Sequence, residues 1–280
     1  MNGFNPLSET SVPRWRPLSD AEFARFRDLL YREMGIHLSD EKKSLVAGRL
    51  MKRLRHYRLT NYADYLEMAH DARNGEELRV LLNLLTTNET HFFREADHFT
   101  FLSGRVLPAR GDTGIFRVWS AACSSGEEAY SIAMVLDNSI AGRAWEVLGS
   151  DANDDVVRKA KRGVYPIESI KDIPESFRKK YCMRGVRSQE GRMLIDRELR
   201  RGVDFRTINL NRPLPPIGTF DAVFLRNVMI YFNNATKREV LDRIYPLIKQ
   251  GGYLMIGHTE SLVESEGKYV KEAPSVYRKP

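Results

Sequence analysis

Two hydrophobic periodicities divide the chain. Between residues 19 and 85, apolar residues recur three and four positions apart, a spacing typical of amphipathic helices. The first predicted helix follows Ser19, which forms a capping-box pattern with Glu22, and three more are expected at about 40–57, 62–72 and 76–85. From residue 115 onward, short β-rich runs alternate with helical runs, and this alternation predicts a parallel sheet flanked by helices.

These patterns predict two domains, a small all-α helical domain followed by an α/β domain with a doubly wound, Rossmann-like sheet. The expected strands lie at 115–121, 145–150, 220–225 and 252–257. An inserted β subdomain interrupts the alternation at about 164–205. The predicted organisation is a flexible tail at 1–18, a helical domain at 19–85, a linker at 86–114 and the α/β domain at 115–280.

Composition and charge limit the kinds of protein to which the chain can belong. The chain has 280 residues and only two cysteines, and no apolar run approaches the ~18–20 residues that cross a bilayer. We therefore expect a cytoplasmic protein without a disulfide framework. The net charge is +7, and residues 158–212 alone carry 16 basic and 7 acidic side chains, a local excess of +9. Such a stretch is either a binding surface for a polyanion or an ordinary solvated face.

The first strand–turn–helix unit suggests a nucleoside ligand without phosphates. Small residues fill the turn 121–126, but Glu127 and Glu128 follow it and would repel a pyrophosphate. No glycine-rich dinucleotide motif or P-loop occurs in the chain. Asp151, at the end of the second strand, is placed to bind ribose hydroxyls. S-adenosylmethionine fits these requirements, although the two glutamates could instead serve only the helix dipole.

Two polar segments border the α/β core. The sequence TTNETHFFR occupies 86–94, and RNVMIYF occupies 226–232 directly after a predicted buried strand. Asn88 and Thr90 could cap a helix, and Arg226 could form a salt bridge. Either pattern could equally bind a ligand at the carboxyl ends of the strands.

Five motifs in order resemble one enzyme family. They are TTNETHFFRE, RVWSAACSSGEEAYSIAM, GSDAND, FDAVFLRNVMIYF and GGYLMIGHTESL. Behind a helical domain, this series resembles the chemotaxis-receptor protein-glutamate O-methyltransferases, the CheR family, over roughly residues 19–280. The resemblance implies transfer of a methyl group from S-adenosylmethionine to receptor glutamates, which yields γ-methyl esters and S-adenosylhomocysteine. It also implies a protein recruited to membrane receptor arrays.

The resemblance assigns roles to individual residues. It implies cofactor contacts by Asn88, Thr90 and Arg94, by Glu128 at the amino group, by Asp151 at the ribose, by Asn209 and Leu210 at the adenine, and by Arg226 and Asn227 under the methionine portion. Arg94 and Tyr231 match residues expected to orient the receptor glutamate. The β subdomain resembles the family's receptor-tethering element, but Val186-Arg187-Ser188 replaces a glycine-bearing loop. Tethering of a receptor C-terminus therefore stays open.

The second predicted helix is strongly basic. Arg49, Lys52 and Arg55 are spaced on the side away from its apolar face, and Arg53 lies beside them. We expect this stripe to dock on the acidic methylation helices of a receptor bundle. An ordinary solvated face is the alternative.

No metal site is expected, because no histidine pairs with another histidine or cysteine at ligand spacing. Two other functions remain as alternatives to receptor methylation. The +9 segment would suit a nucleic-acid methyltransferase, although no amino-methylase motif is present. A non-catalytic scaffold that senses the cofactor is the second.

Overall fold

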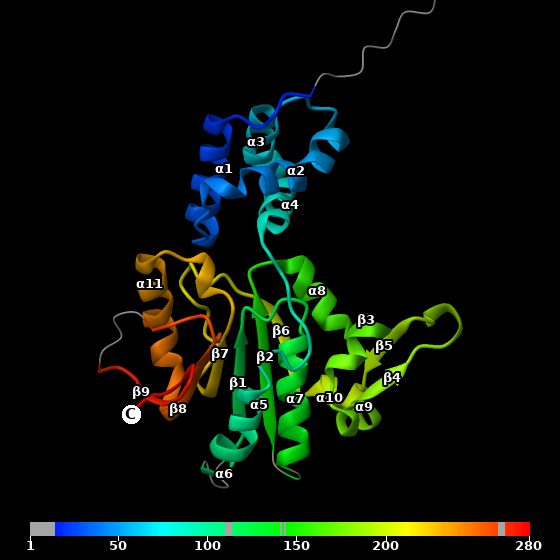
Figure 1. The fold of residues 1–280 in the computed structure, drawn as a ribbon, viewed down its shortest axis with the longest axis vertical. Helices are drawn as coiled ribbons and strands as arrows, with labels where there is room; N and C mark the ends of the chain where they lie inside the picture. Colours follow the sequence, from blue (N-terminus) through cyan, green and yellow to red (C-terminus); the bar gives the residue numbers. More distant parts are fainter. Residues whose placement is uncertain (1–14, 110–113, 141, 143, 263–266) are drawn as a thin grey trace, which may run out of the picture. The chain divides into compact units, whose positions relative to one another are not determined.

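The computed structural model describes residues 15–109, 114–140, 142, 144–262 and 267–280. These residues form two compact units, one of residues 15–30 and 38–85 and the other of residues 31–37 and the described residues from 86 onward (Figure 1). Residues 1–14 of the predicted flexible tail lie outside the described residues. The rest of that tail is attached to the helical unit. The Arg16 N–H donates to the Thr60 carbonyl over 3.0 Å, and Leu18 is buried because its apolar side chain joins the core.

The first unit contains the predicted helices. Its elements are α1 (Asp20–Met34), which continues into the second unit, η1 (Asp40–Lys42), α2 (Lys43–Tyr57), α3 (Tyr62–His70), η2 (Ala72–Asn74) and α4 (Gly75–Leu85). The capping box is confirmed, since the Glu22 N–H donates to Ser19 Oγ and the Ser19 N–H donates to the Glu22 carboxylate. The Tyr57 ring does not share the buried face of α2, because its hydroxyl turns to Glu77.

A seven-stranded sheet forms the centre of the second unit. Its strands are β1 (Phe116–Ala121), β2 (Trp145–Asp151), β6 (Val203–Thr207), β7 (Phe220–Leu225), β8 (Ile248–Ile256), β9 (Val270–Ala273) and β10 (Val276–Arg278). Their order is β6-β2-β1-β7-β8-β10-β9. The first five are parallel, which confirms the Rossmann-like prediction. The last two are antiparallel, because a two-residue connection allows β9 and β10 to pair only as a hairpin.

Both faces of this sheet are covered. Along β7, Ala222 and Phe224 belong to one hydrophobic cluster, and Val223 and Leu225 belong to another. This alternation reflects the two-residue repeat of a strand. The first cluster includes residues of α7 (Glu127–Ser139) and α8 (Asp154–Arg162), and the second includes residues of α11 (Asn234–Ile244). The nearly continuous apolar run FDAVFL is therefore explained by burial on both sides.

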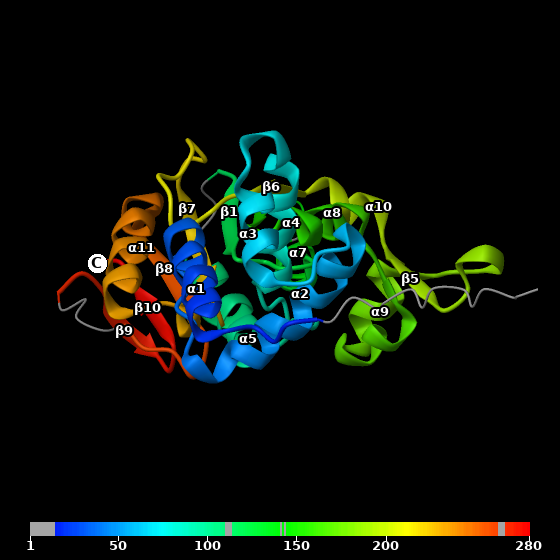
Figure 2. The same ribbon diagram turned by 90° about the horizontal axis from the view of Figure 1, so that it is seen from above.

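A three-stranded antiparallel sheet is inserted between α8 and β6. It consists of β3 (Val164–Pro166), β5 (Arg192–Ile195) and β4 (Cys182–Arg184), in that order. The segment also contains η4 (Ile167–Asp172), α9 (Glu175–Tyr181), η5 (Arg187–Gln189) and α10 (Arg197–Arg201). Figures 1 and 2 show the small sheet on the opposite side of the unit from α11. Residues 203–205, which the sequence analysis placed in the insertion, belong to β6 because they pair with β2.

The predicted linker contains helices of its own. They are α5 (Asp97–Phe101), the short π-helix η3 (Leu102–Val106) and α6 (Leu107–Ala109). Phe99, Leu102 and Val106 pack into the core on the α7 side of the sheet. The remaining short elements are η6 (Met229–Tyr231) and η7 (Tyr245–Leu247). Among the described residues, no helix has the length and apolar character that a membrane crossing requires.

Candidate active site

The turn after β1 is built for close approach of the backbone. Ala122, Ser124 and Gly126 have positive φ angles of 79°, 48° and 96°. A Cβ atom on Gly126 would lie 2.7 Å from the Ala160 Cβ, so α7 and α8 can pack here only if this residue is glycine. The Ser124 hydroxyl donates to the Asn88 carbonyl over 2.9 Å, which holds the 86–95 segment against the turn.

Asp151 ends β2 beside this turn. Its carboxylate accepts the Ser124 and Asn153 backbone N–H groups, each over 2.9 Å. Burial raises the pKa of Asp151 more than these hydrogen bonds lower it, and within the described part of the chain no basic side chain pairs with it. A buried carboxylate without a cation is suited to accept hydrogen bonds from ligand hydroxyls. The Ile208 N–H donates to the Asp151 carbonyl over 3.0 Å, which brings the predicted adenine contacts to the same place.

Of those predicted contacts, Leu210 is buried and Asn209 is half-buried. The Asn209 side-chain amide donates to the Glu33 carbonyl over 2.7 Å, and its oxygen accepts the Asn211 N–H over 2.9 Å. Asn209 therefore holds the C-terminal end of α1 within the second unit, which is called the catalytic unit below. The sequence analysis did not foresee this contact, because the two residues are 176 positions apart.

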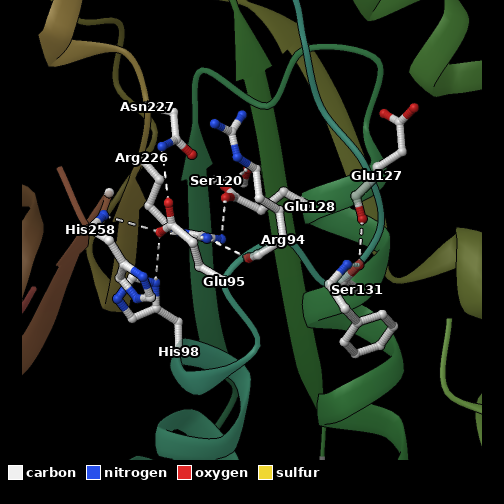
Figure 3. A network of polar contacts seen from close by, with 12 residues as sticks. Arg94, Glu95, His98, Ser120, Glu127, Glu128, Ser131, Arg226, Asn227 and His258 are labelled. Carbon is white, nitrogen blue, oxygen red and sulfur yellow. Dashed lines mark hydrogen bonds and ion pairs between the residues drawn. The ribbon is translucent and has the colours of Figure 1, made fainter. Parts of the chain in front are cut away.

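A second group of charged residues surrounds the guanidinium of Arg226, whose side chain is only 1% exposed. Nη1 lies 2.9 Å from Glu128 Oε2, and Nη2 lies 2.9 Å from Glu95 Oε2 (Figure 3). The Arg94 carbonyl accepts a further hydrogen bond from Nη2, and Ser120 Oγ donates to Glu128 Oε1 over 2.7 Å. The salt bridge that the sequence allowed for Arg226 is thus formed, and it is formed with two carboxylates.

Glu127 and Glu128 have separate roles despite their adjacency. The Glu127 carboxylate accepts hydrogen bonds from Ser125 Oγ, and Figure 3 shows it turned away from Arg226. Burial raises the pKa of Glu128, and this effect exceeds the lowering by Arg226. Glu128 is therefore the carboxylate of the pair that joins the Arg226 group.

Asn227 has a positive φ of 56°, and a glutamate supports that backbone. Glu260 Oε2 accepts the N–H groups of Asn227 and Gly257 over 2.9 and 2.6 Å, and Oε1 accepts the Ile230 N–H over 3.2 Å. Sequence reasoning missed both Glu260 and Glu95 as individual residues. Each was nevertheless inside a motif quoted for the family, GHTESL and TTNETHFFRE.

The two predicted orienting residues, Arg94 and Tyr231, are each partly exposed. Arg94 Nη1 donates to the Glu89 carbonyl over 3.2 Å. The Tyr231 carbonyl accepts the His37 N–H over 2.8 Å, next to an isolated bridge between Ile36 and Phe232. Thr90 is half-buried in the same segment as Arg94.

In the helical unit, the predicted basic stripe divides into two pairs. Arg49 Nη1 donates to the Leu85 carbonyl over 2.9 Å, and Arg53 forms a two-point ion pair with the buried Glu77. Lys52 and Arg55 are exposed. Only the second pair presents its charge mainly to solvent.

Two histidines that are distant in the sequence lie together. The rings of His98 and His258 have centroids 5.0 Å apart, and ligand atoms of Glu95, His98 and His258 all lie within 4.8 Å of one another. The sequence analysis considered only spacing along the chain and therefore did not foresee that these two histidines meet. Arg226 already occupies the Glu95 carboxylate at this cluster.

Comparison with known proteins identifies the family. Residues 21–86 match the CheR methyltransferase all-alpha domain, and residues 88–277 match the CheR methyltransferase SAM binding domain. The chain is 41% identical to the chemotaxis protein methyltransferase of Escherichia coli K12, covering 93% of this chain and 91% of that protein. It is 40% identical to the chemotaxis protein methyltransferase of Salmonella typhimurium, and the match covers 97% of this chain and 96% of that protein.

These findings confirm the resemblance that the five motifs indicated. The carboxylates at the ends of β2 and at the start of α7 agree with the binding of a ligand that carries hydroxyl and ammonium groups. Because both family domains match in order and the relatives align over almost their whole length, this chain belongs to the CheR family of S-adenosylmethionine-dependent methyltransferases.

Proposed function

We propose that the protein methylates glutamate side chains of chemoreceptors and so adjusts sensory adaptation. The observation that carries the proposal is a pair of largely buried carboxylates in a CheR-family domain. Asp151 ends β2, and Glu128, in the first turn of α7, accepts a hydrogen bond from Ser120 of the adjacent strand β1. The relatives named chemotaxis protein methyltransferase support the choice of substrate.

Different residues of the site contact different parts of the proposed cofactor. Asp151 accepts from the ribose hydroxyls, Asn209 and Leu210 border the adenine, and Glu128 accepts from the amino group. Asn88, Thr90, Arg94, Arg226 and Asn227 complete the binding site around the amino-acid end. When bound, S-adenosylmethionine supplies a methyl group on a positively charged sulfur.

The acceptor requires little acid–base chemistry from the protein. A glutamate carboxylate is already ionised near neutral pH, so no general base has to remove a proton. The guanidinium of Arg94 and the hydroxyl of Tyr231 are the groups proposed to orient this carboxylate. Their contribution is alignment and exclusion of water, which can be worth up to about 7–11 kcal/mol for well-oriented groups.

Docking of the receptor is assigned to α2. Lys52 and Arg55 offer exposed positive charge to acidic methylation helices, and Arg49 and Arg53 contribute from partly buried positions. The association should weaken as ionic strength rises, because these charges are screened.

A second receptor contact is proposed for the small sheet of β3, β5 and β4. Val186 and Met183 expose apolar side chains there, at 70% and 44%. Arg187 adopts a φ of 55°, so this loop takes up a left-handed conformation without a glycine. Comparing methylation of a receptor with and without its C-terminal segment tests whether this sheet tethers it, and equal rates would remove the tether from the account.

The chemical test uses methyl-labelled S-adenosylmethionine and membranes that contain chemoreceptors. Mild alkali should release the label as volatile methanol, because a carboxyl ester hydrolyses readily. Asp151→Ala should abolish labelling, whereas the matched Asp204→Ala, at an exposed aspartate paired with Arg206, should retain it. Label that survives alkali would indicate methylation of nitrogen and contradict the proposal.

A further inference from the structure

Glu95 has no role in the site as assigned so far, yet it is central to the Arg226 group. Its side chain is 14% exposed. Oε1 accepts from Asn227 Nδ2 over 3.1 Å, and Oε2 accepts from Arg226 Nη2 over 2.9 Å and from the His258 N–H over 3.3 Å. Both oxygens are therefore engaged with residues of the protein, two of which belong to the proposed cofactor site. Glu95 can act through these residues.

The charges of the group do not balance. Arg226 contributes one positive charge between the carboxylates of Glu95 and Glu128. Burial would raise the pKa of Glu95, but the hydrogen bonds from Arg226 and Asn227 lower it to about 2, so this carboxylate is ionised. His98 adds no charge near neutral pH, because burial and Arg226 lower its pKa to about 4. One negative charge is thus left over when Glu128 is ionised.

A divalent cation is a poor candidate to balance that charge. Glu95, His98 and His258 offer ligand atoms, but Arg226 already lies 2.9 Å from the same Glu95 oxygen. A 2+ ion about 4 Å from a guanidinium is repelled by several kcal/mol even at an effective dielectric constant near 20. A cationic ligand that binds beside Glu128 instead meets a carboxylate whose partner, Arg226, is also paired with Glu95.

We propose that Glu95 is a positioning residue for cofactor binding, because it holds the Arg226 guanidinium from one side and leaves Glu128 with the negative charge that an ammonium group requires. This inference rests on the proposed function, which assigns Glu128 to the amino group of the cofactor. With Glu95 absent, Arg226 and Glu128 form a neutral pair, and Glu128 becomes a weaker acceptor for a second cation.

The test titrates the protein with two ligands that differ at the relevant group. S-adenosylhomocysteine carries the amino-acid portion, whereas 5′-methylthioadenosine shares the adenosine and sulfur but lacks the ammonium group. Glu95→Gln should weaken S-adenosylhomocysteine about tenfold and leave methylthioadenosine unchanged, as expected for the loss of one charge-assisted interaction. Equal weakening of both ligands, or no change in either, would overturn the proposal.

Two further variants separate this claim from its alternatives. Glu77→Gln removes a buried, arginine-paired carboxylate from the helical unit and should leave both affinities unchanged. Glu95→Asp keeps the charge, so its affinity for S-adenosylhomocysteine should lie between those of wild type and Glu95→Gln, and a lower value would contradict the charge argument. This variant also provides the readout if Glu95→Gln does not fold.

Glu128→Gln distinguishes a failure of the role proposed for Glu128 from a failure of the role proposed for Glu95. It should weaken S-adenosylhomocysteine at least as much as Glu95→Gln, and the double variant should lose little more than Glu128→Gln alone. Normal affinity in Glu128→Gln would overturn the assignment of Glu128 and this inference with it. Loss in Glu128→Gln without loss in Glu95→Gln would overturn the inference alone.

Discussion

Each unit of the molecule contains an arginine that is partly or fully buried and paired with glutamate, and the two arrangements differ in charge balance. In the helical unit, Arg53 meets one carboxylate, Glu77, which also accepts hydrogen bonds from the hydroxyls of Tyr57 and Tyr65 over 2.8 and 2.7 Å. In the catalytic unit, Arg226 meets two carboxylates, Glu95 and Glu128. The first group is neutral and satisfied within the protein, whereas the second carries a net negative charge when Glu128 is ionised.

The difference shows how similar ion pairs can serve different purposes. Burial alone would raise the pKa of Glu77, but Arg53 and the two tyrosines outweigh it and the pKa is lowered. For Glu128, burial outweighs its partners and the pKa is raised. A cationic ligand would stabilise the ionised form of Glu128, whose pKa is raised. It would add little to Glu77, because its partners in the protein already stabilise the charged form.

Removal of the two arginines should give the largest effects and should separate the two groups. Arg226→Met leaves two buried carboxylates without a cation and should cost about 3–5 kcal/mol of unfolding free energy. Arg53→Met leaves one carboxylate that two tyrosines still hydrogen-bond, so its cost should be smaller. Denaturant unfolding of both variants measures the difference, and equal losses would undo the comparison.

Asp151→Asn should weaken ligand binding more than it changes stability. The variant loses an ionised acceptor for the ribose, which should weaken S-adenosylhomocysteine by about 10- to 100-fold, since hydrogen bonds to charged groups are worth about 1.5–3 kcal/mol. Burial raises the pKa of Asp151, so loss of its charge favours the fold near neutral pH, but its two oxygens accept the Ser124 and Asn153 N–H groups and an amide can accept only one of them. These two effects oppose each other, so the free energy of unfolding should change less than the free energy of binding. Calorimetric titration measures the affinity and thermal unfolding measures the stability, and an unchanged affinity for S-adenosylhomocysteine would count against a ligand role.

His98 should make the protein sensitive to mild acid. Its pKa is lowered from 6.5 to about 4, first by burial and then by Arg226, so the unfolded chain binds the proton more readily. Stability from the neutral ring is complete above pH 6.5 and falls as the pH drops toward 4, by about 2 kcal/mol at pH 5. The free energy of unfolding is measured at pH 7.5 and 5 for wild type and for His98→Asn. The variant should lack the part of the pH dependence that titration of His98 causes. The same pH slope in both proteins would contradict the assignment.

Charge reversal on α2 should give the smallest change in the folded protein. Lys52→Glu combined with Arg55→Glu should reduce receptor methylation at low salt by several-fold, alter stability by less than about 0.5 kcal/mol, and leave S-adenosylhomocysteine affinity unchanged. Lys171→Glu combined with Lys179→Glu, at exposed positions on η4 and α9, provides the control with the same change in net charge. If both proteins methylate receptor membranes at the wild-type rate, the solvated-face interpretation of α2 is correct.

The sequence was informative wherever the signal is local. The Ser19–Glu22 capping box, the buried run of β7 and the small-residue turn before α7 could each be predicted from spacing and residue type. Motif resemblance added the segments that meet at the carboxyl ends of the strands. These features depend on residues that are close together in the chain.

Contacts between distant residues could not be predicted in this way. Glu95 and Arg226 are 131 positions apart, and nothing in either neighbourhood shows that a second acid reaches the arginine. The same holds for Arg53, which spacing placed on a docking stripe and the fold pairs with Glu77. The antiparallel edge of the sheet was missed because β9 and β10 are short and weakly apolar.

The most direct test of the central claim locates the methyl group. A receptor cytoplasmic fragment, incubated with the protein and S-adenosylmethionine, is digested and fragmented in a mass spectrometer before and after mild alkali. The account predicts methyl groups on glutamate side chains, all removed by alkali and all absent with Asp151→Ala. Methyl groups on lysine, arginine or a terminal amine, unchanged by alkali, would contradict it.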